Sequence, residues 1–104
     1  MRRIEYAGGA FYTGDAIAEA LLDYARELAR NSTADTVFIP AQGIDGDMRR
    51  VEVLLGPASQ LLSEPMSLVG AEITDEALVE RIRHLSDRLA AGRPGHDEPF
   101  IDPE

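Results

Sequence analysis

The sequence predicts an α+β fold, a two-layer sandwich in which a small mixed sheet of about four strands carries two helices on one face. Two segments repeat apolar residues at helical spacing, and several shorter segments alternate apolar with polar residues. The elements follow in the order strand, helix, strand, strand, strand, helix. A chain of 104 residues has room for one modest core. We therefore expect one domain over residues 1–92, followed by a Pro-rich acidic tail over residues 93–104.

The first half of the chain predicts one strand and one helix. Residues 3–6 alternate polar and apolar side chains, which is typical of a short, half-buried strand. Residues 7–14 are rich in glycine and predict a loop. Residues 15–30 have helical periodicity, and Thr13 or Asp15 is placed to cap the first turn.

The central part of the chain predicts three strands. Residues 36–41 form the second strand, and Pro40 places that strand at an edge or near its end. Asp45-Gly46 predicts a hairpin turn before the strongest strand, residues 48–55. Residues 57–62 are interpreted as a short helix that begins with proline, and residues 66–72 as the fourth strand.

The second helix has clear start and stop signals. Thr74 is the expected N-cap, acids fill the first turn, and Ile73 can pack against Leu78. Gly92 and Pro94 end the helix. Its apolar stripe is narrow, so this helix needs only one buried face.

The first helix is apolar over more of its circumference than one contact requires. Its core-facing stripe consists of Ile17, Leu21, Tyr24 and Leu28. A second stripe, mostly of small residues, lies beside the first and consists of Ala18, Leu22, Ala25 and Ala29. At about 100° per residue the two stripes span about 200°. One stripe is expected to face the sheet, and the other the second helix or another copy of the chain.

Four acids occupy the remaining side of this helix at i+4 spacing: Asp15, Glu19, Asp23 and Glu27. They could bind a basic partner protein, and a solvated helix face is the simpler interpretation. Asp23 with Arg26, and Glu27 with Arg30, can form i,i+3 ion pairs that offset the repulsion between neighbouring acids.

The segment from Gly9 to Gly14 has the glycine spacing of a phosphate-binding loop, but the lysine that this motif requires is replaced by Asp15. A carboxylate there repels phosphate, so no nucleotide is expected. We interpret His84 and His96 as surface residues. A small pocket is possible between residues 7–14 and residues 56–60. Its polar contacts would be Tyr12, Ser59 and Gln60.

Composition excludes several classes of chemistry. The sequence has no lysine and no cysteine, so neither a Schiff base nor a thiolate site can form. A net charge of −9 argues against nucleic acid and against anionic membranes. We expect no cofactor, no metal and no membrane contact. All ten basic residues are arginine, a usage typical of a high-GC bacterial genome, and without an apolar leader we expect the protein to be cytoplasmic.

No motif identifies a reaction, and the sequence favours a protein that is not an enzyme. The leading interpretation is a non-catalytic protein-interaction module that acts as a homodimer through the second stripe of the first helix. Phe100 and Ile101 in the tail are a further apolar contact, expected to anchor the tail. One alternative is a small-ligand-binding protein or minor enzyme that uses the pocket. Another is an acidic inhibitor, or antitoxin-like partner, of a basic protein.

Overall fold

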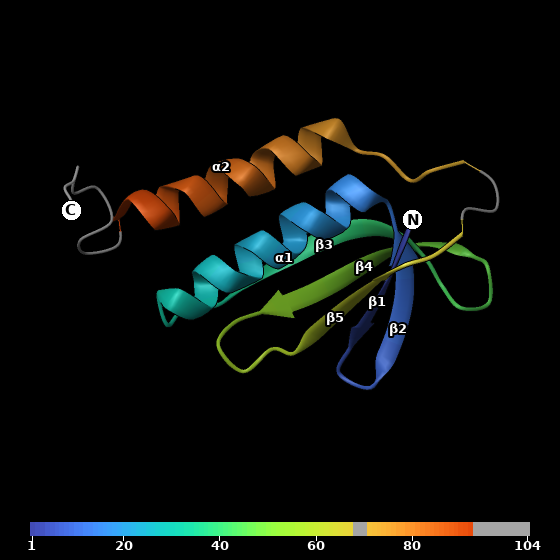
Figure 1. Cartoon of the computed structure of the whole chain (residues 1–104), viewed down its shortest axis with the longest axis horizontal. Helices are drawn as coiled ribbons and strands as arrows, with labels where there is room; N and C mark the ends of the chain where they lie inside the picture. Colours follow the sequence, from blue (N-terminus) through green and yellow to red (C-terminus); the bar gives the residue numbers. More distant parts are fainter. Residues whose placement is uncertain (68–70, 93–104) are drawn as a thin grey trace.

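The computed structural model describes residues 1–67 and 71–92. It has an α+β fold in which a five-stranded antiparallel sheet carries two helices (Figure 1). The elements, in chain order, are β1 (Arg2–Tyr6), β2 (Gly9–Thr13), α1 (Asp15–Arg30), β3 (Asp35–Gln42), β4 (Met48–Leu55), β5 (Leu61–Pro65) and α2 (Glu76–Gly92). The predicted fold class is confirmed. The sheet has five strands instead of about four, and all its pairings are antiparallel instead of mixed.

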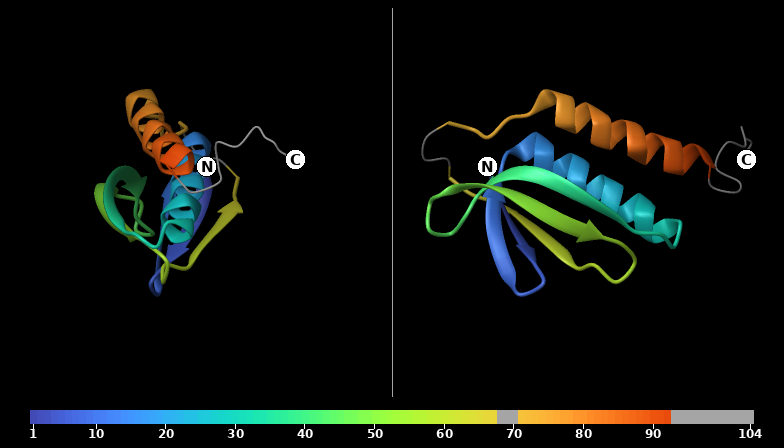
Figure 2. Two further views of the ribbon diagram at one scale, coloured as in Figure 1. Left: turned by 90° about the vertical axis from the view of Figure 1, so that its left-hand side faces the viewer. Right: turned by 180° about the vertical axis from the view of Figure 1, so that it is seen from behind.

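The strand order in the sheet is β4-β3-β2-β1-β5, so β4 and β5 are the two edges. The β3–β4 pair is long and runs from Asp35 opposite Leu55 to Gln42 opposite Met48. The junction between β2 and β3 is a single pair, Tyr12 opposite Gln42. Because so little pairing joins the two halves, the sheet divides into a β3–β4 ribbon and a β2–β1–β5 ribbon that curve around α1 (Figure 2).

The core lies between α1 and the concave side of the sheet. Alternate residues of β3 and β4 point into it, among them Ile39, Ala41, Val53 and Leu55, and all four are fully buried. Ile4 on β1 lies opposite Phe11 on β2, and both are buried. Every residue of the predicted core-facing stripe of α1 is also buried.

Residues 7–14 were expected to form a loop, and this prediction is wrong. Only Ala7 and Gly8 form a turn, at φ 53° and 83°, and Gly9–Thr13 continues as β2. Phe11 and Thr13 alternate inward and are buried. The strand was missed because its sequence is short and contains glycine, and because threonine is its only β-branched residue.

The region after β4 also differs from the prediction. Residues 57–62 are not a helix: Pro57 and Ala58 form a turn, and β5 begins at Leu61 and pairs with β1. Residues 66–67 and 71–72 lie outside any strand, and residues 68–70 lie outside the described residues. The prediction therefore placed the last strand about five residues too far along the sequence. Tertiary pairing with β1 overrides the weak local signal of Leu61–Pro65.

Both helix caps differ from the predictions. Gly14 is the N-cap of α1 and has no side-chain cap; instead, the backbone N–H of Asp15 donates to Oε2 of Glu72 at 2.6 Å. Thr13 donates its hydroxyl to the carbonyl of Pro40 at 2.8 Å. In α2 the cap is Asp75, one residue after the predicted Thr74, because its Oδ1 accepts from the N–H of Leu78 at 3.1 Å.

Helix α2 lies alongside α1, on the same side of the sheet (Figure 1). Leu78 and Ile82 are its buried apolar residues, in agreement with a single narrow stripe. Arg83 of α2 reaches Glu19 at 3.3 Å and Asp23 at 3.5 Å. These ion pairs place α2 beside the acidic side of α1, not beside the stripe of small residues.

Candidate functional site

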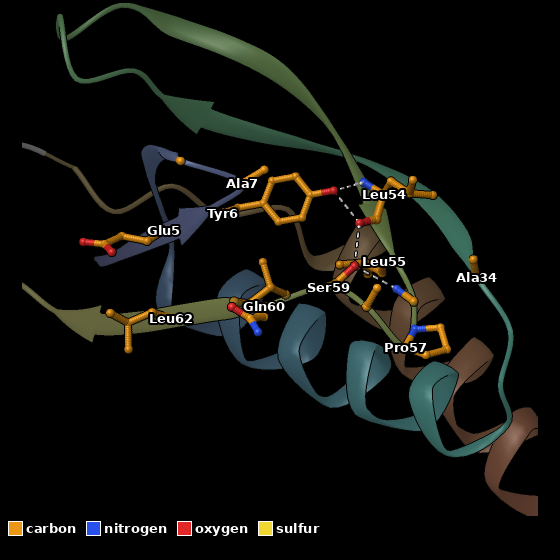
Figure 3. A pocket seen from close by; sticks show the side chains of 14 residues that line it. Glu5, Tyr6, Ala7, Ala34, Leu54, Leu55, Pro57, Ser59, Gln60 and Leu62 are labelled. Atoms are coloured by element: carbon orange, nitrogen blue, oxygen red, sulfur yellow. Dashed lines mark hydrogen bonds between the residues drawn. The ribbon is translucent and has the colours of Figure 1, made fainter.

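A hollow lies between the β1–β2 turn and the β4–β5 loop (Figure 3). Its volume is about 950 Å³. Ala7 and Gly8 contribute from the turn, and residues 56–60 contribute from the loop. This is the place where the sequence predicted a pocket.

The hollow contains two of the three predicted contact residues. Ser59 and Gln60 line it, whereas Tyr12 does not. Tyr12 lies on β2 opposite Arg3 and alternates with the buried Phe11, so its side chain leaves the sheet on the convex side. Tyr6 lines the hollow and was not predicted to do so. An aromatic residue at the end of a half-buried strand is usually a core residue, and the sequence offered no sign of its polar contacts.

Tyr6 spans from β1 to β4, two strands that are not neighbours in the sheet. Its hydroxyl donates to the carbonyl of Leu54 at 2.5 Å and accepts from the N–H of Leu54 at 3.1 Å. Figure 3 shows the ring crossing one side of the hollow toward β4. The hydroxyl therefore binds the free edge of β4 as a neighbouring strand would.

Ser59 is bound in the same network. Its hydroxyl donates to the carbonyl of Leu54 at 3.1 Å and accepts from the N–H of Gly56 at 3.0 Å. These two bonds close the β4–β5 loop. The hydroxyls of Tyr6 and Ser59 thus serve structural bonds, and the carboxylate of Glu5 pairs with Arg3. The side chain of Gln60 is therefore the polar lining group that remains toward a ligand among the described residues.

A cluster of three charged groups lies at the start of α1. The amino group of Met1 is 2.8 Å from Oδ1 of Asp15 and 2.8 Å from Oε1 of Glu72. The hydrogen bond from this amino group, followed by that from the backbone of Asp15, lowers the pKa of Glu72. The hydrogen bonds to Asp15 and Glu72 raise the pKa of the amino group. This cluster joins β1, α1 and the segment before α2.

The second stripe of α1 is covered unevenly. Ala18 is buried, Leu22 and Ala25 are half-buried, and Ala29 is exposed. Leu22 borders a hollow of about 370 Å³ that Arg2 and Ser63 also line, so this stripe faces the β1–β5 side of the fold. The dimer contact through this stripe stays a prediction. The other predicted contact residues, Phe100 and Ile101, lie outside the described residues.

Each acid of the predicted ridge has a cationic neighbour. Asp15 pairs with the amino group of Met1, and Glu19 pairs with Arg83. Two further pairs join neighbouring turns of α1, between Asp23 and Arg26 at 3.1 Å and between Glu27 and Arg30 at 3.2 Å. The ridge is thus largely neutralised within the chain, which lowers its attraction for a basic partner.

Several large apolar side chains are exposed on the strands of the sheet. The exposed fractions are 43% for Phe38, 61% for Met48 and 56% for Leu54, and all three lie on β3 or β4. On the second edge strand, β5, Leu62 is 50% exposed. Ile44 in the β3–β4 turn and Met66 after β5 are exposed as well.

No group of three or more potential metal ligands occurs among the described residues. His84 is exposed, as expected, and His96 lies outside the described residues. Neither helix of the described chain is long and apolar enough to cross a membrane. Comparison with protein-family models, curated proteins and solved structures finds no match to this chain.

Proposed function

We propose that this chain is a non-catalytic protein-interaction module that acts as a homo-oligomer. The observation that supports the proposal best is the exposed surface of the β3–β4 ribbon. Phe38, Met48 and Leu54 are each at least 43% exposed there, on or beside an edge strand that has an unpaired side. Exposed apolar side chains at an open sheet edge favour association with another chain.

The use of the polar side chains also supports a binding role over a catalytic one. The hydroxyls of Tyr6 and Ser59, beside the hollow between the β1–β2 turn and the β4–β5 loop, bind the main chain of β4 and its loop. A general base or nucleophile needs a reacting group within hydrogen-bond reach, and neither hydroxyl has a His or carboxylate partner within its bonds. The bacterial and cytoplasmic setting suggested by composition belongs to this proposal.

Sedimentation velocity on the intact chain over a wide concentration range tests the proposal. Reversible association is expected to appear as a weight-average sedimentation coefficient that rises with concentration. High salt should weaken the association only partly, because apolar contacts are not screened. A chain that sediments as a monomer at every concentration contradicts the proposed function.

The second candidate is binding of a small ligand in the hollow between the β1–β2 turn and the β4–β5 loop. The specific observation in its favour is the volume of about 950 Å³, with apolar walls from Pro57 and Leu61. NMR titration with a fragment library tests it. Shifts confined to residues 5–8 and 54–62, and lost in Gln60→Ala, would support this role, and unspecific or absent shifts would exclude it.

A further inference from the structure

We infer that β4 pairs with β4 of a second copy in an antiparallel register centred on Val51. This inference deepens the proposed function and rests on it, because it assigns the surface through which the chain self-associates. The second copy would displace no strand, since β4 pairs with β3 alone among the strands of the described residues.

The main chain of β4 determines which residues can bond to a new strand. Both the N–H and the C=O of Leu54 bind the hydroxyl of Tyr6, so they point away from β3. A second observation agrees. Arg50 lies opposite Pro40 of β3, which has no N–H and whose C=O accepts a hydrogen bond from Thr13 of β2. Pro40 therefore offers no main-chain partner to Arg50, so the peptide groups of Arg50 point away from β3. Since orientation alternates along a strand, Met48, Arg50, Glu52 and Leu54 all direct their peptide groups to the free edge.

In an antiparallel pair, two such outward-directed residues must lie opposite each other. A two-fold axis at Val51 fulfils this condition because it sets Arg50 opposite Glu52 of the second copy, twice in the dimer. An axis at Arg50 would oppose the two Arg50 side chains, and an axis at Glu52 would oppose the two Glu52 side chains. Like charges directly opposite are unfavourable, so the register centred on Val51 is preferred among these three.

The side chains fit the same register. Met48 and Leu54 are 61% and 56% exposed, and the register places each opposite the other in the second copy. Arg50 is held over the ring of Phe38, with its guanidinium carbon 4.6 Å from the ring centre. Neither Arg50 nor Glu52 forms an ion pair with another residue of the described chain. Both charges are therefore available to a second copy.

Tyr6 limits the length of the shared ladder. Because its hydroxyl already binds the peptide groups of Leu54, the main-chain bonds between copies are confined to Arg50 and Glu52. Beyond them, Met48 and Leu54 contribute side-chain contact only. A ladder this short predicts a reversible dimer and not an extended aggregate, which is how many proteins restrict edge strands.

Charge exchange at these two positions tests the inference. In Arg50→Glu every cross-strand charge pair becomes Glu–Glu, and in Glu52→Arg every pair becomes Arg–Arg. Each variant alone should associate about tenfold more weakly than the wild type. An equimolar mixture of the two variants restores both Arg–Glu pairs and should associate as the wild type does. The double variant R50E/E52R should also recover, because exchange of both charges preserves every pair.

Sedimentation velocity on the wild type, the two single variants, their mixture and the double variant gives all outcomes in one experiment. Circular dichroism of each variant tests whether the monomer remains folded. Arg88→Glu, an exposed change on α2, is the control that should leave association unchanged. Wild-type association that none of these variants alters overturns the β4 assignment and leaves the proposed function standing. A wild type that is monomeric throughout overturns both.

Discussion

The hydroxyl of Tyr6 binds both main-chain groups of Leu54, 48 residues later in the sequence, at 2.5 Å to the carbonyl and 3.1 Å from the N–H. This contact links β1 to the edge strand β4, although β2 and β3 lie between them in the sheet. It therefore holds the two ribbons of the sheet together at the end opposite the Tyr12–Gln42 pair. This hydroxyl thus connects the two ribbons and occupies the edge of β4 at Leu54.

Tyr6→Phe should destabilise the fold by about 1–2 kcal/mol, because the N–H of Leu54 loses its partner and the carbonyl of Leu54 keeps only the bond from Ser59, while the ring remains. Urea unfolding followed by circular dichroism measures this change. Tyr12→Phe is the matched control, since it removes a hydroxyl from the convex side without touching β4, and it should have a smaller effect. Equal losses for the two variants would show that the bridge to Leu54 has no special role.

Gly14→Ala should destabilise the protein by about 1–3 kcal/mol through overpacking. An added Cβ would lie 1.7 Å from the carbonyl oxygen of Ile73, so the segment before α2 must move. Gly9→Ala is the control, because its Cβ would meet the Tyr6 carbonyl oxygen at an ordinary 3.7 Å. Thermal unfolding of the two variants measures the difference, and equal melting temperatures would contradict the close approach of Ile73 to Gly14.

Glu72→Gln should remove a part of the acid sensitivity of the fold. Hydrogen bonds from the amino group of Met1 and the backbone of Asp15 lower the pKa of Glu72 in the folded state. The stabilisation is therefore present above the ordinary pKa, about 4.3, and is lost as the pH falls through the lowered value. Urea unfolding between neutral and acid pH should show a shallower decline for Glu72→Gln than for the wild type. Parallel declines would indicate that this carboxylate is not bound as described.

Tyr24 should make the fold sensitive to alkali. Burial, and then the hydrogen bond that its hydroxyl donates to Asp35 at 2.5 Å, raise the pKa of Tyr24. The stabilisation is complete below the ordinary pKa of about 10 and declines as the pH rises above it, because only the unfolded chain ionises there. Tyr24→Phe should be less stable at neutral pH and should lose less stability on the way to alkaline pH. Unfolding curves of both proteins across this range measure the difference, and identical slopes would refute it.

Much of the fold could be predicted because it depends on local patterns. The periodicity of residues 15–30, the Asp45-Gly46 turn and the alternation in residues 48–55 each predicted the observed element. In that turn Gly46 adopts φ +91°, the conformation for which glycine is suited. The errors concern β2 and β5, whose sequences are weak alone and become strands by pairing with β1.

The position of the hollow was predicted, but its hydrogen bonds were not. Ser59 and Gln60 could be assigned because a loop after a broken strand exposes polar groups. The bridge from Tyr6 to Leu54 and the cap from Glu72 to Asp15 join residues 48 and 57 positions apart. No short-range pattern records such contacts, since they depend on how the ribbons of the sheet curve in three dimensions.

The most direct test of the central claim uses the absence of cysteine from this chain. In the register centred on Val51, the two Val51 residues form a non-hydrogen-bonded pair whose Cα atoms are about 4.5 Å apart, close enough for a disulfide. The two Arg49 residues lie four strand positions apart, about 13 Å, too far for one. Under mild oxidation Val51→Cys should therefore form a disulfide-linked dimer at dilute concentration, and Arg49→Cys should not. Equal crosslinking of the two variants, or none in Val51→Cys, would contradict pairing of β4 with a second copy.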